Sequence, residues 1–170
     1  MTHYAVISNA SASPKSKKGI GAYLILPLEI VQTPGLEIYD SAFSNEMKYV
    51  KLENTSSTEA EIKTAIKAVK SISGDKKAGE ISITLYTDSQ NIVKLPRRRK
   101  RLEKSDYISK RSGKELKNAN LYKEFYRLHD DFITEIVKVE GHKPAGQRDQ
   151  TEEIFSYVDR KVREKFRSLK

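Results

Sequence analysis

The sequence of 170 residues has no cysteine, no tryptophan and only two methionines. Without cysteine, disulfide bonds and thiolate metal sites are excluded, so any metal ion would have to be held by carboxylate or imidazole groups. This lack is compatible with a reducing cytoplasm, which is the location we expect. The eight glycines and five prolines are ordinary usage and indicate neither a collagen-like nor a generally disordered chain.

Long apolar runs are also missing. The start of the chain, Met1 to Ser8, has no basic stretch followed by an apolar one, so no signal peptide is expected. No run approaches the roughly 18 apolar residues of a membrane helix, and we expect no membrane partner. Hydrophobic residues make up 37% of the chain, which is enough for one core. We therefore expect a single domain over residues 1–170, without an obligate protein partner and as a monomer.

Positive charge, in contrast, is abundant and localised. The net charge is +9, and residues 97–117 hold ten Lys or Arg against three Asp or Glu, a net +7. A localised basic segment is typical of a surface that binds a polyanion, although a solvated basic helix would give the same run. The residues that we expect to contact nucleic acid in this segment are Arg97, Arg98, Arg99, Lys100 and Arg101.

The hydrophobic pattern predicts alternating strands and helices. A continuous apolar run at 4–8 is typical of a central strand that is buried on both faces. Further strands are predicted at 21–28, 37–52, 81–87 and 132–140, and helices at 91–95 (ended by Pro96), around 121–128 and around 154–169. The first helix is the clearest, because Ser56 and Glu59 form a capping box before an apolar stripe that runs from Ile62 to Ile72.

Three strands before any helix indicate an antiparallel meander, and the later strands alternate with helices. The predicted fold class is therefore α/β, with a mixed five-stranded sheet flanked by helices. In this sheet the first three strands are antiparallel and the fourth and fifth are parallel. A basic helical protrusion is predicted around residues 96–118.

Four positions near strand ends and helix starts could carry chemistry. Asp88 ends the fourth strand, Glu61 lies near the start of the first helix, and Asp149 or Glu152 opens the last helix. Asn9, with the shape of an aspartate, ends the first strand. Clustered carboxylates repel one another unless cations neutralise them, and two hard cations about 4 Å apart can clamp a phosphodiester. Taken singly, each acid is more often a turn former or a helix cap.

Four segments in chain order carry a more specific pattern. They are Ser8-Asn9-Ala10-Ser11 with the glycine-led Gly19–Tyr23, the helix Glu61–Val69, the strand end Leu85–Gln90, and Val137–His142. Together they resemble the opening strand and loop, the glutamate helix, the Thr-Asp-Ser strand end and the histidine loop of the type 1 ribonuclease H family. The resemblance covers essentially the whole chain.

The resemblance implies a ribonuclease H-like fold and an endonuclease that cuts the RNA strand of RNA–DNA hybrids with two Mg²⁺ ions, or with Mn²⁺. Its metal ligands would be Asn9, Glu61, Asp88 and an acid at the start of the last helix, with His142 assisting product or proton handling. Asp149 has the family's side-chain type, whereas Glu152 fits the helix phase better. The remaining nucleic-acid contacts implied are Ser11, Thr55, Ser56, Ser57, Ser89 and Gln90.

The main departure from the family pattern is Asn9, because a neutral amide cannot bridge two cations as a carboxylate does. The chain as written is therefore expected to be nearly inactive, either by a deliberate Asp→Asn substitution or by natural loss. Two alternatives remain open. One is a non-catalytic hybrid-binding module of the same fold, and the other is an integrase-like nuclease acting on DNA, for which Glu152 is the one favourable feature.

Overall fold

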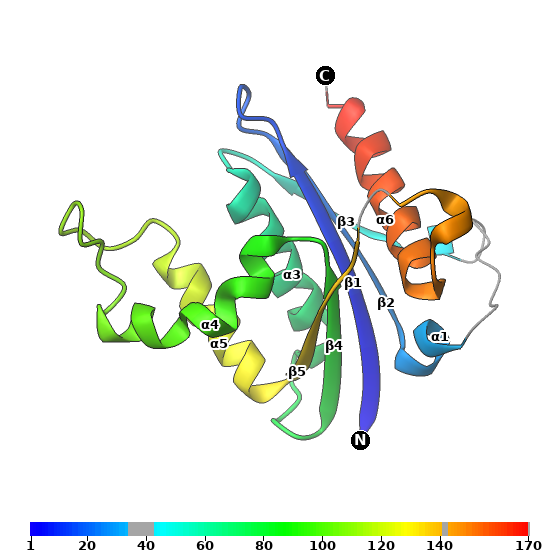
Figure 1. Ribbon diagram of the computed structural model, residues 1–170, viewed down its shortest axis with the longest axis horizontal. Coiled ribbons are helices and arrows are strands. Elements are labelled where there is room, and N and C mark those ends of the chain that lie inside the picture. The colour runs from blue at the N-terminus through cyan, green and yellow to red at the C-terminus, as the bar shows by residue number, and fades with distance from the viewer. Residues whose placement is uncertain (34–42, 141–142, 170) are drawn as a thin grey trace.

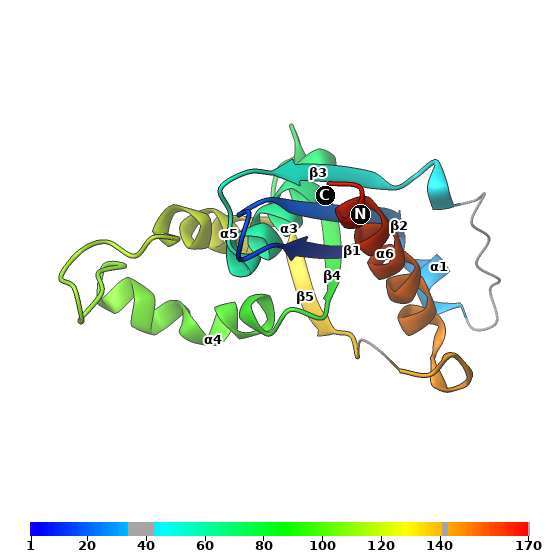
Figure 2. The ribbon, with the colours of Figure 1, turned by 90° about the horizontal axis from the view of Figure 1, so that it is seen from above.

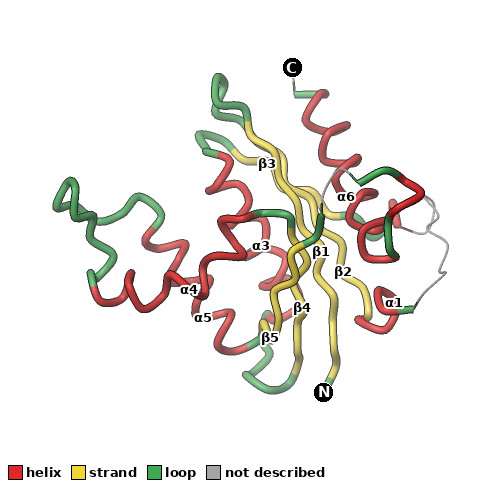
Figure 3. The backbone as a smooth tube through the Cα atoms, in the orientation of Figure 1, coloured by secondary structure: helices red, strands yellow, loops and turns green. Residues whose placement is uncertain are grey.

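The protein is described by a computed structural model that covers residues 1–33, 43–140 and 143–169. A five-stranded sheet in the order β3-β2-β1-β4-β5 forms its centre (Figures 1 and 3). β1 pairs with β2, and β2 with β3, in antiparallel fashion, whereas β1–β4 and β4–β5 are parallel. The predicted fold class is confirmed. The strands are β1 Thr2–Ala12, β2 Gly19–Pro27, β3 Lys48–Leu52, β4 Ile81–Thr87 and β5 Ile133–Lys138.

Helices cover both faces of this sheet. In Figure 1, α3 and α5 lie on one side of the strands, and α6 and α1 lie on the other. No helix among residues 1–33, 43–140 and 143–169 has the length and apolarity needed to cross a membrane. The helices are α1 Leu28–Gln32, α3 Ser57–Ser73, α4 Gln90–Lys104, α5 Ala119–Asp131 and α6 Gln150–Arg167, with a 3₁₀ turn at Ala145–Gln147.

Two hydrophobic clusters hold the layers together, and β1 contributes to both. Val6 belongs to the cluster under α3 and α5, whereas Ile7 belongs to the cluster under α6. Because successive strand residues point to opposite faces, a strand covered on both sides must be apolar at every position. This explains the continuous apolar run in the sequence. On β2, a Cβ added at Gly21 would lie 2.8 Å from Cβ of Thr64, so this glycine permits the close approach of α3.

Several predicted boundaries are wrong. β1 extends to Ala12, so Asn9 lies within the strand and does not end it. The strand predicted at 37–52 is observed only at 48–52, and its part at 37–42 lies outside the described residues. Three strands were predicted before any helix, whereas the short helix α1 lies between β2 and β3.

The short helix that was predicted to stop at Pro96 continues to Lys104 as α4. Proline lacks the N–H that would bond the carbonyl four residues earlier, which usually ends a helix at a cost of about 3 kcal/mol. Here burial of Ile92, Leu95 and Leu102 on one face offsets that loss. The Tyr126 hydroxyl also donates a 2.6 Å hydrogen bond to the carbonyl of Leu95. Tertiary packing therefore overrides the local signal.

Candidate functional site

The site is built around Asn9 on β1. Its Nδ2 donates a 2.8 Å hydrogen bond to Oδ1 of Asp159, which lies on α6, 150 residues further along the chain. The other carboxylate oxygen of Asp159, Oδ2, is 3.1 Å from Nη2 of Arg163 on the next turn of the helix. Both oxygens of Asp159 therefore have partners, one neutral and one cationic.

Asp88 directly follows β4, the parallel neighbour of β1. The parallel register pairs Ile7 of β1 with Tyr86 of β4, and both belong to the cluster that faces α6. Two residues after Ile7, Asn9 points to that same face, since strand side chains repeat every second residue, and its hydrogen bond to Asp159 of α6 agrees with this. The cavity next to them is lined by Asp88, Glu140, Arg148, Glu152, Asp159 and Arg163, among others.

Glu61 reaches the same edge from α3, on the other face of the sheet. Its Oε2 accepts a 2.5 Å hydrogen bond from the Ser89 hydroxyl and a 3.5 Å one from Nδ2 of Asn91. The Ser89 side chain also caps α4, because its Oγ accepts from the backbone N–H of Ile92 at 3.3 Å. The residue directly after Asp88 thus fixes both the start of α4 and the carboxylate of Glu61.

The two acids expected to open the last helix do lie there and cap it, and metal binding by Asp149 or Glu152 stays a prediction. Oδ1 of Asp149 accepts from the backbone N–H of Glu152 at 2.8 Å, and Oε1 of Glu152 accepts from that of Asp149 at 3.1 Å. This is a complete capping box at the start of α6. Glu152 is also 3.0 Å from Nζ of Lys143. The backbone hydrogen bond from Asp149 and the contact with Lys143 lower the pKa of Glu152. The acid that meets Asn9 is Asp159.

Sequence reasoning missed Asp159 because it expected the fourth acid in the first turn of the helix. A signal for it exists in the helix phase. Asp159 follows Phe155 by four residues and the buried Val158 by one, which places it at the border of the apolar stripe of α6 and next to the sheet. His142, predicted for the loop before this helix, lies outside the described residues.

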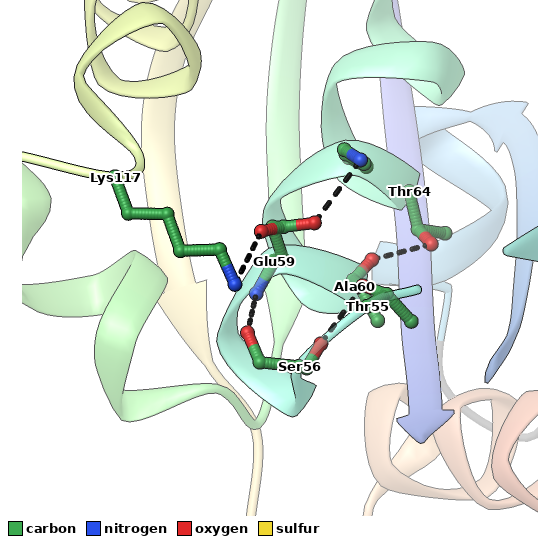
Figure 4. A network of polar contacts seen from close by, with 7 residues as sticks. Thr55, Ser56, Glu59, Ala60, Thr64 and Lys117 are labelled. Carbon is green, nitrogen blue, oxygen red and sulfur yellow. Dashed lines mark hydrogen bonds and ion pairs between the residues drawn. The ribbon is translucent and has the colours of Figure 1, made fainter. Parts of the chain in front are cut away.

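The predicted phosphate contacts at Thr55, Ser56 and Ser57 lie at the start of α3, and Figure 4 shows the first two of them. Ser56 is the N-cap as predicted, since its Oγ accepts from the backbone N–H of Glu59 at 3.2 Å. Thr55 is buried and its hydroxyl donates to the carbonyl of Ser56 at 3.0 Å. The hydroxyls of Thr55 and Ser56 thus have local structural partners, and Ser57 is exposed. Phosphate binding by these residues stays a prediction.

The same helix start contains a buried acid, Glu59. Its carboxylate is 3.1 Å from Nζ of Lys63 and 3.5 Å from Nζ of Lys117, which reaches across from the loop before α5. Burial by itself would raise the pKa of Glu59, but the two lysines bring it below its usual value. A negative charge here opposes phosphate binding, while the exposed Lys117 favours it.

The basic segment projects away from the sheet on α4 and the loop at 105–118 (Figure 2). Four cationic side chains border one hollow along the exposed face of α4, namely Lys94, Arg97, Arg98 and Arg101. A second, adjoining hollow lies between α4 and the loop, and its cationic lining is Arg98, Lys100, Arg101, Lys104, Lys110 and Arg111. We call these two hollows together the basic groove.

Arg99, within the same run, is bound differently. Its two terminal nitrogens lie 2.5 and 2.9 Å from the carboxylate oxygens of Asp130, and its Nε donates to Glu103 at 2.7 Å. Its guanidinium also lies over the ring of Tyr126 at 5.1 Å. The hydrogen bonds to Asp130 and Glu103 raise the pKa of Arg99. Arg99 therefore connects α4 to α5 and differs in role from its neighbours in the groove.

The oxygen donors of Glu61, Asp88 and Asp159 are of the type that Mg²⁺ prefers. Among residues 1–33, 43–140 and 143–169, however, no three Asp, Glu or His side chains lie close enough together to hold one ion. Glu61 fits a hard cation, since the hydrogen bonds that it accepts come from neutral groups, and Asp88 offers the same type of oxygen donor. Asp159 fits one less well, because its oxygens are already bonded to Asn9 and Arg163.

Comparison with known proteins supplies a family. Residues 3–156 match the RNase H family, and the match ends three residues before Asp159. A search of curated proteins by sequence finds no match.

Two solved structures show the likeness in fold. One is described as LC9-RNase H1, a type 1 RNase H with the type 2 active-site motif. It has 16% identity and a TM-score of 0.63, with 94% of this chain and 69% of that chain covered. The other, a foamy viral protease-reverse transcriptase in complex with dsDNA, has 15% identity and a TM-score of 0.57, with 92% and 90% covered. At such identities the likeness shows the fold alone.

Proposed function

This chain belongs to the ribonuclease H family, and we propose that it is built to hydrolyse the RNA strand of RNA–DNA hybrids with bound Mg²⁺, or with Mn²⁺ in its place. The observation that carries this proposal is the meeting of four elements at one edge of the sheet. Asn9 on β1 bonds Asp159 on α6, Asp88 directly follows β4 and lines a cavity together with Asp159, and Glu61 on α3 is bonded to Ser89.

A divalent cation in this site would polarise the scissile phosphate and supply a hydroxide-like water for its attack. The residues of the chain that would hold it are Glu61 and Asp88. Ser89 and Asn91 fix the Glu61 carboxylate before any ligand arrives, because both donate hydrogen bonds to its Oε2. A preorganised carboxylate does not have to be ordered again when the substrate binds.

The basic groove supports a nucleic-acid substrate. α4 starts at Gln90, directly after Asp88 and Ser89, so its cationic face leads away from the acidic edge. From Lys94 to Lys104 the helix rises about 15 Å, which matches roughly four nucleotides at 3.4 Å per step. Contacts with phosphates position the duplex without reading its sequence. We propose that the choice of RNA over DNA comes from the 2′-hydroxyls in the wide minor groove of the hybrid.

Asn9 limits this activity. The family has an aspartate at this position, and an amide carries no charge with which to bridge two cations. We therefore propose that the chain as written binds hybrids but cleaves them slowly. The alternative, a hybrid-binding module without catalysis, is favoured by one specific observation. The carboxylate of Asp159 is already satisfied by Asn9 and Arg163.

Cleavage of a labelled RNA–DNA hybrid in Mg²⁺ tests the proposal by comparing the chain with its Asn9→Asp variant. We expect the variant to cut the RNA strand at least about 100-fold faster, since it regains a charged ligand at the centre of the site. A DNA duplex of the same sequence serves as the control and should remain intact. If neither protein cuts while both bind the hybrid, the binding-module alternative replaces the enzyme.

A further inference from the structure

We propose that the part of the basic groove farthest from the acidic edge binds an unpaired strand that flanks the hybrid. This part is the hollow between α4 and the loop at 105–118, and we call it the distal hollow. The other part is the proximal hollow, whose lining is Lys94, Arg97, Arg98 and Arg101. The inference rests on the proposed function, because it names the class of hybrid that this chain takes, one with a single-stranded end.

The distal hollow is cationic and its charges are free to act on a ligand. Its cationic lining is Arg98, Lys100, Arg101, Lys104, Lys110 and Arg111, and no Asp or Glu of the described chain lines it with them. None of these six side chains forms an ion pair with an acid in the part of the chain that the structure describes, whereas Arg99 pairs with both Asp130 and Glu103. Such a cluster of uncompensated cations attracts a polyanion.

The distal hollow continues the proximal one, because Arg98 and Arg101 line both. The guanidinium of Arg98 lies 5.2 Å from the ring centre of Tyr122, which orients it at this junction. Figure 2 shows α4 and the loop projecting together from the sheet. At about 1.5 Å per residue, a strand that follows α4 from its start reaches Arg101 after roughly 16 Å, or about five nucleotides. This continuity favours nucleic acid over an acidic peptide as the occupant.

The distal hollow also offers apolar surface, which a duplex does not use. Ile108 is 37% exposed and Leu116 is half-buried, and both line the hollow beside the cations. A single exposed isoleucine is ordinary on a protein surface, but this one lies inside a cationic hollow. The faces of paired bases are stacked within a duplex, whereas unpaired bases expose theirs to a groove that tracks their phosphates. Because these side chains are aliphatic, each base gains less than it would on an aromatic ring.

The loop that forms one wall of the distal hollow is held in place by its own contacts. Asp106 and Tyr107 have positive φ angles of 52° and 58°, which turn the chain back after α4. The N–H of Tyr107 donates to the carbonyl of Leu102 at 2.9 Å, and the N–H of Leu116 donates to the carbonyl of Tyr107 at 2.8 Å. The Tyr107 side chain is buried. Since Ile108 and Leu116 are positioned before a ligand arrives, binding requires less ordering of the loop.

Binding of hybrids with and without an unpaired flank tests the inference. The full chain is titrated in EDTA, so that no strand is cut, with a blunt hybrid and with hybrids whose DNA or RNA strand is extended by about six nucleotides at either end. We expect at least one extension to raise the affinity by about tenfold. The same extension made of abasic nucleotides keeps the phosphates but has no bases, and its gain should be smaller by about threefold or more.

Two matched variants locate the contact. Lys110→Gln/Arg111→Gln removes one lysine and one arginine from the distal hollow, and Lys94→Gln/Arg97→Gln removes the same charges from the proximal hollow. The distal variant should lose most of the gain from the extension, whereas the proximal variant should weaken blunt and extended hybrids by the same factor. Ile108→Ser should lower the affinity for the extended hybrid toward that for the abasic one. Thermal unfolding checks that each variant is folded.

The outcomes separate this inference from the proposed function. Equal affinity for blunt and extended hybrids overturns the inference, and the distal hollow would then suit another polyanion, such as an acidic peptide. A gain that the abasic extension, the distal variant or Ile108→Ser retains in full also overturns it. If Asn9→Asp cleaves the blunt hybrid and no extension raises the affinity, the function stands and the inference fails. If the extension binds as expected and Asn9→Asp cleaves nothing, the inference stands and the catalytic function fails.

Discussion

The acidic edge and the basic groove both concentrate charge, but they hold it in opposite ways. The acids at the edge, Glu61, Asp88 and Asp159, are far apart in sequence, half-buried and individually bonded. The cations of the groove are almost consecutive in sequence and most are exposed to solvent. Half-buried charges interact strongly with fixed partners, whereas exposed charges are screened and act roughly additively. The edge is therefore suited to chemistry and the groove to general attraction.

The largest effect should come from removing an acid at the edge. In the Asn9→Asp background, Asp88→Asn should lower the rate of hybrid cleavage by roughly 100-fold or more, because a cation ligand is lost. Binding of the hybrid should change little, since the groove is intact. Single-turnover cleavage and a binding titration on the same samples measure both quantities. If the affinity for the hybrid fell as much as the cleavage rate, the acidic edge would contribute to binding as well as to catalysis, and the separation of roles between edge and groove would be wrong.

The next effect should come from the exposed face of α4. Replacing Lys94, Arg97 and Arg101 together by glutamine should weaken hybrid binding and reduce its salt dependence. If each side chain contacts one phosphate, the slope of log K against log salt should fall by about 2 to 3. A control that removes the same charge elsewhere, at Lys48, Lys51 and Arg167, should leave the slope nearly unchanged. An equal fall in both variants would mean that net charge alone, and not the groove, governs binding.

The smallest effect should come from Arg99, a member of the basic run that is tied to two acids, Asp130 and Glu103. Arg99→Gln should lower the free energy of unfolding by about 1 kcal/mol at pH 7, after allowance for solvent screening. The hydrogen bond from Arg99 lowers the pKa of Asp130 below its ordinary value of 3.8. This stabilisation is therefore present above that value and is lost as the pH falls through the lower folded-state pKa.

Denaturant unfolding of both proteins at pH 7 and at about pH 3 measures this difference. The difference in the free energy of unfolding between the original chain and Arg99→Gln should be smaller at about pH 3 than at pH 7. The salt slope of hybrid binding should be nearly the same for Arg99→Gln and the original chain. A slope reduced as much as by an exposed arginine would show that Arg99 contacts the hybrid after all.

Most of the fold was readable from local patterns. The N-cap at Ser56, the continuous apolar run of β1 and the apolar stripes of α3 and α6 are short-range signals that act within one element, although the Glu59 side chain pairs with Lys63 and Lys117 and does not complete the predicted capping box. The continuation of α4 past Pro96 could not be predicted from the sequence. It depends on the packing of Leu102 and on the hydroxyl of Tyr126, which belongs to α5. Contacts between distant elements leave no periodic trace in one sequence.

The site shows the same division. Asn9, Glu61 and Asp88 could be singled out because each sits at a recognisable place in a strand or helix. Asp149 and Glu152 could be singled out for the same reason, but their carboxylates are used to start α6. Asp159 lies beyond the first turn, where no local rule marks an acid. Only the packing of α6 against β1 brings it within 2.8 Å of Asn9.

The sequence by itself determined the order of the five strands and of the longer helices, the family resemblance and the basic segment, because these depend on residue type and on spacing along the chain. The tertiary structure decided which acid meets Asn9, which basic residue is withdrawn to bind Asp130, and that Asp159 pairs with Arg163. The physical reason is that hydrogen bonds and ion pairs depend on distance and direction. Their strength is set by which side chains the packed sheet and helices bring together, often from opposite ends of the chain.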